Sequence, residues 1–213
     1  GEAEGASIAI DTSGNVVVSG TVKGTLGTTT NVGGEDSFVA KYNTAGVEQW
    51  LQRFGGTADD RTMSVTLGSD GTVYVAGEAK SGFGDTAHAG GAWDGYVRAI
   101  SADGTHEWTR RIGDTGEERA KAIAVADDGG LLVASEEDGR AILRKYSSAD
   151  GTGAALWETD LGDLDGGRIG SIAVDGTDIY LAGAAGSAFA PSAPLTANAG
   201  GRDAMVVKLT DGA

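Results

Sequence analysis

Acidic residues stand beside an arginine at three equivalent places in the sequence. The three segments are Asp59-Asp60-Arg61, Glu117-Glu118-Arg119 and Asp163-Leu164-Asp165-Gly166-Gly167-Arg168. Carboxylate oxygens are the ligands that calcium prefers, which makes calcium the cofactor these segments would suit. The candidate metal ligands are Asp59, Asp60, Asp163 and Asp165. Because each acid has an arginine nearby to neutralise it, the pattern favours salt bridges between structural units over a calcium site.

A second candidate site surrounds Trp93, which lies in a glycine-rich segment beside Asp94 and downstream of His88. An exposed aromatic ring next to an acid is typical of carbohydrate sites, where the ring stacks on a sugar. A loop tryptophan can also simply cover its own hairpin, and this packing role is the stronger expectation. The candidate ligand-binding residues are Trp93, Asp94, His88, Arg61, Arg119 and Arg168.

The residue patterns of common catalytic centres are absent from the sequence. It has no Gly-x-Ser-x-Gly elbow, no phosphate-binding loop with its lysine and no dinucleotide-binding glycine pattern. There is no cysteine, and His88 and His106 are the only histidines, so a thiol nucleophile is excluded and a metal or catalytic site built on histidines is not expected. We therefore expect no catalytic residues. The enzymatic alternative is a glycoside hydrolase or lyase with two carboxylates facing one pocket.

The chain is strongly acidic, with 16 Lys and Arg against 31 Asp and Glu and a formal net charge of −15. Such a charge repels phosphate backbones and anionic lipids, so nucleic acid is not an expected partner. No apolar run reaches the length of a membrane span, and residues 1–4 lack the regions of a signal peptide. We expect a soluble chain that is part of something longer, with a glycan or a protein as partner.

Four copies of one pattern account for the whole chain. Apolar runs centred on Ile8, Val65, Ile123 and Ile172 recur at roughly 50-residue spacing. Each is followed by a turn rich in Asp and Gly and by a second apolar run, as in a β-hairpin. A third run follows in every copy, and in three copies a fourth run carries Trp50, Trp108 or Trp157. Four short antiparallel strands per copy predict the blade of a β-propeller rather than a β-sandwich, which does not require repeats.

The copies span approximately residues 1–54, 55–112, 113–161 and 162–213 of a single propeller domain. The last copy ends before any tryptophan strand. The sequence thus predicts three complete four-stranded blades and a fourth that lacks its outer strand, alone or within a larger propeller. The open edge of the fourth blade is then expected to contact the remainder of a parent protein. The recurring tryptophans are expected to pack between blades.

The motifs resemble those of a bacterial β-propeller repeat family, the SBBP-type repeats. The first copy carries Asp11-Thr-Ser-Gly-Asn15, then Gly33-Gly-Glu-Asp36-Ser-Phe-Val-Ala-Lys41, then Gly46-Val-Glu-Gln-Trp50. The third copy departs from the pattern, because Asp138-Gly139 replaces the Gly-Gly-x-Asp element. The resemblance implies an extracellular or cell-surface scaffold without a shared catalytic centre.

The function that follows is a non-enzymatic interaction or scaffold module of a secreted or surface bacterial protein. A calcium-dependent carbohydrate-binding or adhesion module is the first alternative. A glycoside hydrolase or lyase is the second, and a structural spacer without any ligand is the third.

Overall fold

The computed structural model describes residues 1–29, 32–82, 87–187, 189 and 201–212. Within these ranges every regular element is a β-strand, and the strands form four separate antiparallel sheets. No helix in the described part of the chain is long and apolar enough to cross a membrane.

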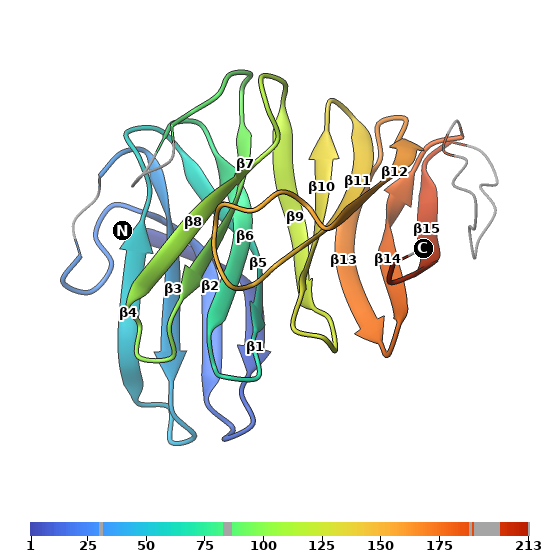
Figure 1. The fold of residues 1–213 in the computed structure, drawn as a ribbon. Coiled ribbons are helices and arrows are strands. Elements are labelled where there is room, and N and C mark those ends of the chain that lie inside the picture. Colours follow the sequence, from blue (N-terminus) through green and yellow to red (C-terminus); the bar gives the residue numbers. More distant parts are fainter. Residues whose placement is uncertain (30–31, 83–86, 188, 190–200, 213) are drawn as a thin grey trace.

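Each sheet contains consecutive strands in the order of the sequence, so each is one blade (Figure 1). Blade 1 contains β1 (Glu2–Ile10), β2 (Val16–Lys23), β3 (Glu35–Tyr42) and β4 (Glu48–Phe54). Blade 2 contains β5 (Asp60–Leu67), β6 (Val73–Ala79), β7 (Asp94–Ile100) and β8 (His106–Ile112). Blade 3 contains β9 (Glu118–Val125), β10 (Leu131–Glu137), β11 (Arg140–Tyr146) and β12 (Trp157–Asp163). Blade 4 contains β13 (Arg168–Asp175), β14 (Asp178–Ala185) and β15 (Asp203–Thr210). The predicted four-bladed β-propeller, with a three-stranded last sheet, is confirmed.

Turn chemistry sets the first hairpin of each blade. The Asp11 carboxylate accepts hydrogen bonds from Ser13 N and Asn15 N, both at 2.9 Å, and Gly14 takes a φ of 81° that favours glycine. Asp70 likewise accepts a bond from Thr72 N. In the third hairpin the side chain that bonds the turn is Asp128, which accepts from Gly130 N. The sequence had suggested Asp127 for that role.

A β-bulge interrupts every inner strand at the same repeat position. The register shifts between Gly5 and Ser7 in β1 and between Thr62 and Ser64 in β5. Equivalent shifts occur opposite Ala134 and Ser135 in β9 and between Ile169 and Ser171 in β13. The extra residue in each strand is Ala6, Met63, Lys121 or Gly170. Because a bulge re-aims a side chain, Met63 and Lys121 reach the inner rim of the propeller.

The hydrophobic core lies between blades rather than within one. Val17 and Val39 of blade 1 pack with Val65, Val75 and Ile100 of blade 2. Two similar clusters join blade 2 to blade 3 and blade 3 to blade 4. Trp50, Trp108 and Trp157 each pack against one of the three clusters, so the predicted packing role of these residues is confirmed.

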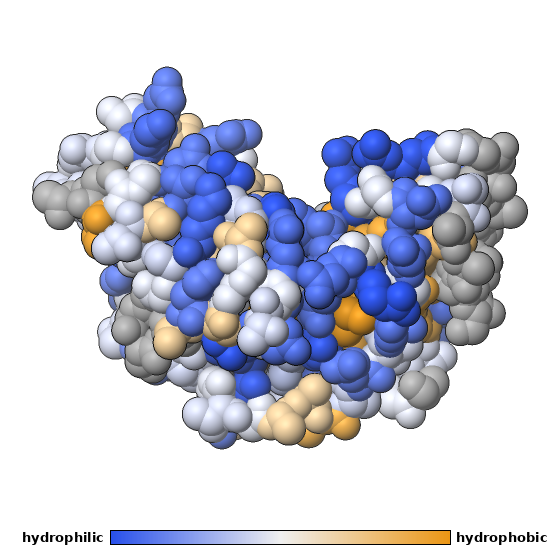
Figure 2. Space-filling view, turned by 90° about the horizontal axis from the view of Figure 1, so that it is seen from above, coloured by the Kyte–Doolittle hydropathy of each residue, from blue (hydrophilic) through white to orange (hydrophobic). Residues whose placement is uncertain are grey.

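The first and last blades leave faces uncovered. Consecutive blades pack along the inner strands β1, β5, β9 and β13, but no comparable packing joins β13 to β1 among the residues the structure describes. Viewed from above, the molecule is hollowed on one side (Figure 2). We call the outward surface of blade 1 the open face. Its residues are Ile8, Ile10, Val16, Val18 and Tyr42.

The open face repeats residues that are core elsewhere. Ile8 and Ile10 are 64% and 66% exposed. At the repeat position of Ile8, Val65 is 6% and Ile123 is 4% exposed. The difference arises because blades 2 and 3 each have a preceding blade against this surface, whereas blade 1 has none in the described structure.

One pair of substitutions tests this burial pattern. Ile123→Ala should lower the free energy of unfolding by about 2–5 kcal/mol, because it leaves a cavity between blades 2 and 3. Ile8→Ala, the same change at the same repeat position, should stay within about 0.5 kcal/mol of the parent. Guanidinium denaturation of both variants provides the measurement. Equal losses of stability would contradict the exposure of Ile8.

Candidate functional site at the inner rim of blades 1 to 3

Trp93 lies under a group of cations that belong to the chain itself. Its ring is only 6% exposed, and its carbonyl accepts a hydrogen bond from Glu118 N at 2.9 Å. The Lys80 Nζ atom is 4.6 Å from the ring centroid, and the guanidinium carbons of Arg61 and Arg119 are 5.0 and 5.2 Å from it. These are cation–π distances. The exposed ring that the carbohydrate-site alternative needs is therefore not found, and the burial of Trp93 agrees with the favoured packing role, although the ring ties blade 2 to blade 3 rather than only covering its own hairpin.

Glu78 is the anion that holds the same cations together. It lies on β6 and is 1% exposed. Its carboxylate oxygens are 3.8 Å from Arg61 Nη1, 3.3 Å from Arg119 Nη1 and 3.7 Å from Lys121 Nζ. Arg61 also pairs with Glu35 of blade 1 at 2.8 Å. One buried carboxylate and its arginines thus connect three successive blades. The sequence predicted salt bridges at Arg61 and Arg119, but with the acids beside them, and of those acids only Glu117 pairs with its arginine.

Asp94 and its equivalent Asp36 cap the turns that precede β7 and β3. Asp94 Oδ2 accepts from Ala89 N at 2.7 Å and lies 3.1 Å from His88 Nδ1. Asp36 Oδ2 accepts from Val32 N at 3.1 Å and pairs with Arg53 at 2.7 Å. In both copies the aspartate that ends the glycine-rich element thus caps the turn before the third strand.

Blade 3 reverses the charges of this ion pair. Arg140 stands where Asp36 stands in blade 1, and Asp160 stands where Arg53 stands. Arg140 Nη2 and Asp160 Oδ2 are 2.6 Å apart. The pairing between the third and fourth strands is kept, although the third copy has lost the Gly-Gly-x-Asp element.

A pair of buried carboxyl groups lies between blades 1 and 2. Asp36 is fully buried and Asp60 is 1% exposed. A Cβ atom on Gly55 would lie 2.7 Å from Asp36 Oδ1 and 2.8 Å from Asp60 Oδ2, so both acids approach the same point. Burial raises the pKa of Asp60 to about 7; a hydrogen bond from Gly56 N opposes the rise, and the Asp36 charge adds to it. Burial likewise raises the pKa of Glu118, which lies near Asp94 between blades 2 and 3.

Of the remaining predicted site residues, Asp59 borders the rim cluster through Lys80, whereas Asp163 and Asp165 lie on the side of blades 3 and 4. Asp163 and Asp165 lie around the connection from β12 to β13, where Asp163 Oδ1 accepts from Asp165 N at 2.8 Å. Asp59 pairs with Lys80 at 2.8 Å, and Arg168 begins β13. No group of three or more His, Cys, Asp or Glu is placed to hold a metal ion in the described ranges. Calcium binding stays a prediction.

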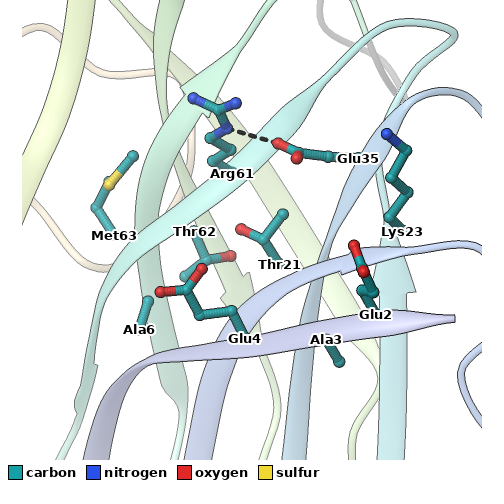
Figure 3. A pocket seen from close by; sticks show the side chains of 10 residues that line it. All are labelled: Glu2, Ala3, Glu4, Ala6, Thr21, Lys23, Glu35, Arg61, Thr62 and Met63. Atoms are coloured by element: carbon teal, nitrogen blue, oxygen red, sulfur yellow. Dashed lines mark hydrogen bonds and ion pairs between the residues drawn. The ribbon is translucent and has the colours of Figure 1, made fainter.

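A pocket of about 540 Å³ opens at the inner rim between β1 and β5 (Figure 3). Three carboxylates and two cations line it, namely Glu2, Glu4, Glu35, Lys23 and Arg61. Thr62 and Met63 complete its wall on the β5 side. The Arg61–Glu35 ion pair crosses the pocket between two blades. Two of the lining residues therefore also hold the blades together.

Sequence reasoning missed the two residues that organise the rim, Glu78 and Lys80. A signal for Glu78 was present, since it is a single charge that ends an apolar strand, Val73–Ala79. A carboxylate in such a place needs a buried partner. Its partners come from β5 and β9, and strand packing of this kind is not visible in one sequence.

Fold and site together define a four-bladed β-propeller whose inner rim is held by ion pairs across blades. No family model matches the chain. It is 30% identical over 250 aligned residues to the regulatory protein FlaEY of Caulobacter vibrioides, an alignment that covers 98% of this chain. The chain spans only 26% of that relative's length.

A solved structure shares the fold. It is a crystal structure of a protein of unknown function from Bacteroides caccae, with a TM-score of 0.53 and 18% sequence identity. The match covers 87% of this chain and 54% of that one. At this identity the likeness is one of fold alone.

Replacement of the titratable Asp60 carboxyl by an amide should change how the free energy of unfolding depends on pH. The folded-state pKa of Asp60 is raised from 3.8 to about 7. Stability from this group is therefore complete below its unfolded-state pKa and is lost as the pH rises from there through 7, by on the order of 4 kcal/mol in total. Asp60→Asn should flatten the fall in unfolding free energy between pH 5 and 8, leaving the contribution of Glu118.

Asp59→Asn is the matched control for that experiment. The hydrogen bond from Lys80 lowers the pKa of Asp59, so its linkage lies below the window from pH 5 to 8. The control should keep the slope of the parent. If Asp60→Asn also kept that slope, the buried protonated carboxyl would be refuted.

Loss of the Glu78 charge should weaken the contact between blades 2 and 3. Glu78→Gln removes the shared anion of Arg61, Arg119 and Lys121 and should cost about 1.5–3 kcal/mol of unfolding free energy. Glu117→Gln is the control, because Glu117 pairs with Arg119 but is 45% exposed in its side chain. It should cost less than about 1 kcal/mol. Equal effects in urea denaturation would argue against a central role for Glu78.

Proposed function

We propose that the chain is a non-enzymatic β-propeller segment that works by protein–protein contact, as a scaffold within a larger bacterial protein. The observation that carries the proposal is the open face of blade 1. Ile8 and Ile10 expose about two thirds of their surface, although Val65 and Ile123, at the repeat position of Ile8, are buried in the core. A contiguous apolar surface on a soluble fold marks a contact site for another protein surface.

The relatives support a role inside a longer protein. The chain spans about a quarter of the regulatory protein FlaEY, so that protein has much further chain beside the matching part. A regulatory activity of the kind that name states would be exercised here through protein contacts. A secreted or surface location is part of the proposal and rests on the resemblance to SBBP-type repeats.

The alternatives receive less support from the geometry. Stacking of a glycan on Trp93 would first require removal of Arg61, Lys80 and Arg119 from its ring. In the rim pocket, Glu35 is paired with Arg61, so a glycosidase reading would depend on Glu2 and Glu4 as the two carboxyl groups that face a sugar. The protein-contact function therefore ranks above the adhesion and hydrolase alternatives.

Cysteine labelling tests the proposal directly, because the chain contains no native cysteine. Ile8→Cys should react with a maleimide about tenfold faster, or more, than Ile123→Cys, which is reached only through local opening of the blade 2–3 interface. Equal, slow rates would mean that the chain covers its own open face, and they would overturn the proposal.

A further inference from the structure

One contact recurs between successive blades, but the turn of blade 1 receives no such contact from a described residue. Each outer-strand tryptophan reaches the turn between the third and fourth strands of the next blade. Trp50 Nε1 donates to the Ala102 carbonyl at 3.1 Å, and Trp157 Nε1 donates to Asp211 Oδ1 at 3.0 Å. Residues 102 and 211 hold the same repeat position, and in blade 1 this position is Thr44.

Glycines in these turns leave room for the tryptophan ring, because a side chain there would collide with it. A Cβ atom on Gly104 would lie 2.7 Å from Trp50 Cγ, and one on Gly151 would lie 3.1 Å from Trp108 Cε3. The equivalent of Gly104 in blade 1 is Gly46, and no described atom lies within 4 Å of the same point there. Blade 1 therefore presents the turn that receives a tryptophan, next to the apolar open face, with neither covered.

The residues of the open face match those of a covered blade one by one. Ile8, Ile10, Val16, Val18 and Tyr42 correspond to Val65, Leu67, Val73, Val75 and Ile100 of blade 2. All five residues of blade 2 belong to or pack against the cluster shared with blade 1. The surface that fits the open face is thus the surface that blade 1 itself offers to blade 2: small and β-branched side chains with one phenylalanine and one tryptophan.

We infer that the open face of blade 1, with Thr44 and Gly46, is the docking seat for a further complete blade of the same repeat, supplied by a longer polypeptide that includes this chain. The incoming blade covers Ile8 and Ile10 and donates its tryptophan N–H to Thr44. This inference rests on the proposed function. It extends it by naming the occupant of the open face.

A second copy of this chain fits the seat less well. The blade it would offer is blade 4, and the sequence contains no tryptophan after Trp157. The described part of blade 4 ends with β15, its third strand. The turn at Thr44–Gly46 would then stay empty. The relative is about four times as long as its match to this chain, so further chain exists there to supply a complete blade.

The test adds one blade to the chain and measures the reactivity of the open face. Residues 118–167 of blade 3 are placed ahead of Glu4, in place of residues 1–3, because Glu4 and Arg168 hold the same repeat position. Ile8→Cys in this extended chain should react with a maleimide at least about tenfold more slowly than in the chain alone. Ile123→Cys should react equally slowly in both.

A matched extended chain carries Leu132→Asp in the added blade only. Leu132 is fully buried where blade 3 meets blade 4, so an aspartate there spoils the docking surface. In this control Ile8→Cys should react as fast as in the chain alone. Sedimentation of the unextended chain should give a monomer.

The outcomes separate the inference from the proposed function. Ile8→Cys could react fast in the chain alone and equally fast after extension, whether or not the added blade folds. This result would overturn the docking seat and leave the exposure of the open face intact. Slow reaction in the chain alone would overturn both. Slowing that grows with protein concentration, together with a dimer, would identify a second copy as the occupant and overturn the inference.

Discussion

A sheet of four short strands has two faces and cannot bury both by itself, and this constraint governs the molecule. Each blade contributes one wall of two neighbouring cores, so Val39 and Val75 are buried only because another blade faces them. Repeat proteins share this dependence on the nearest neighbour. It explains why residues at one repeat position differ so much in exposure. It also means that the first and the last described blade each lack one packing partner.

Polar groups at the rim supplement this apolar packing and give it order. Glu78 gathers arginine and lysine from β5 and β9, and the same two arginines, Arg61 and Arg119, lie over the ring of Trp93. In a chain of net charge −15, most of the surface is acidic, yet here the cations meet around one buried carboxylate. Carboxyl groups at Asp60 and Glu118 are buried in the adjacent interfaces at a cost in solvation. The rim is therefore the part of the fold most sensitive to charge.

The sequence predicted the strands, the blades and the packing of the tryptophans, because each depends on local patterns that recur four times. It also predicted salt bridges at Arg61 and Arg119, but with the neighbouring acids as partners, whereas Arg61 pairs with Glu35 and Glu78. It favoured a packing role for Trp93 but predicted neither the cations over its ring nor the central place of Glu78. Both depend on side chains from three strands that are distant in the chain and adjacent only after the blades pack. The open face was equally invisible, because Ile8 reads as a core residue until its missing neighbour is known.

The tryptophan-to-turn contact has a direction. Every tryptophan reaches forward from one blade to the next, and none of the three reaches back. The two faces of a blade therefore differ: one carries the tryptophan, and the other carries the turn that receives a tryptophan. Units joined in this way can associate only head to tail, so face-to-face pairing about a local two-fold axis would leave every tryptophan without its turn. The handedness of the resulting curve is the same at each step, and the order of repeats along the polypeptide becomes their order around the axis.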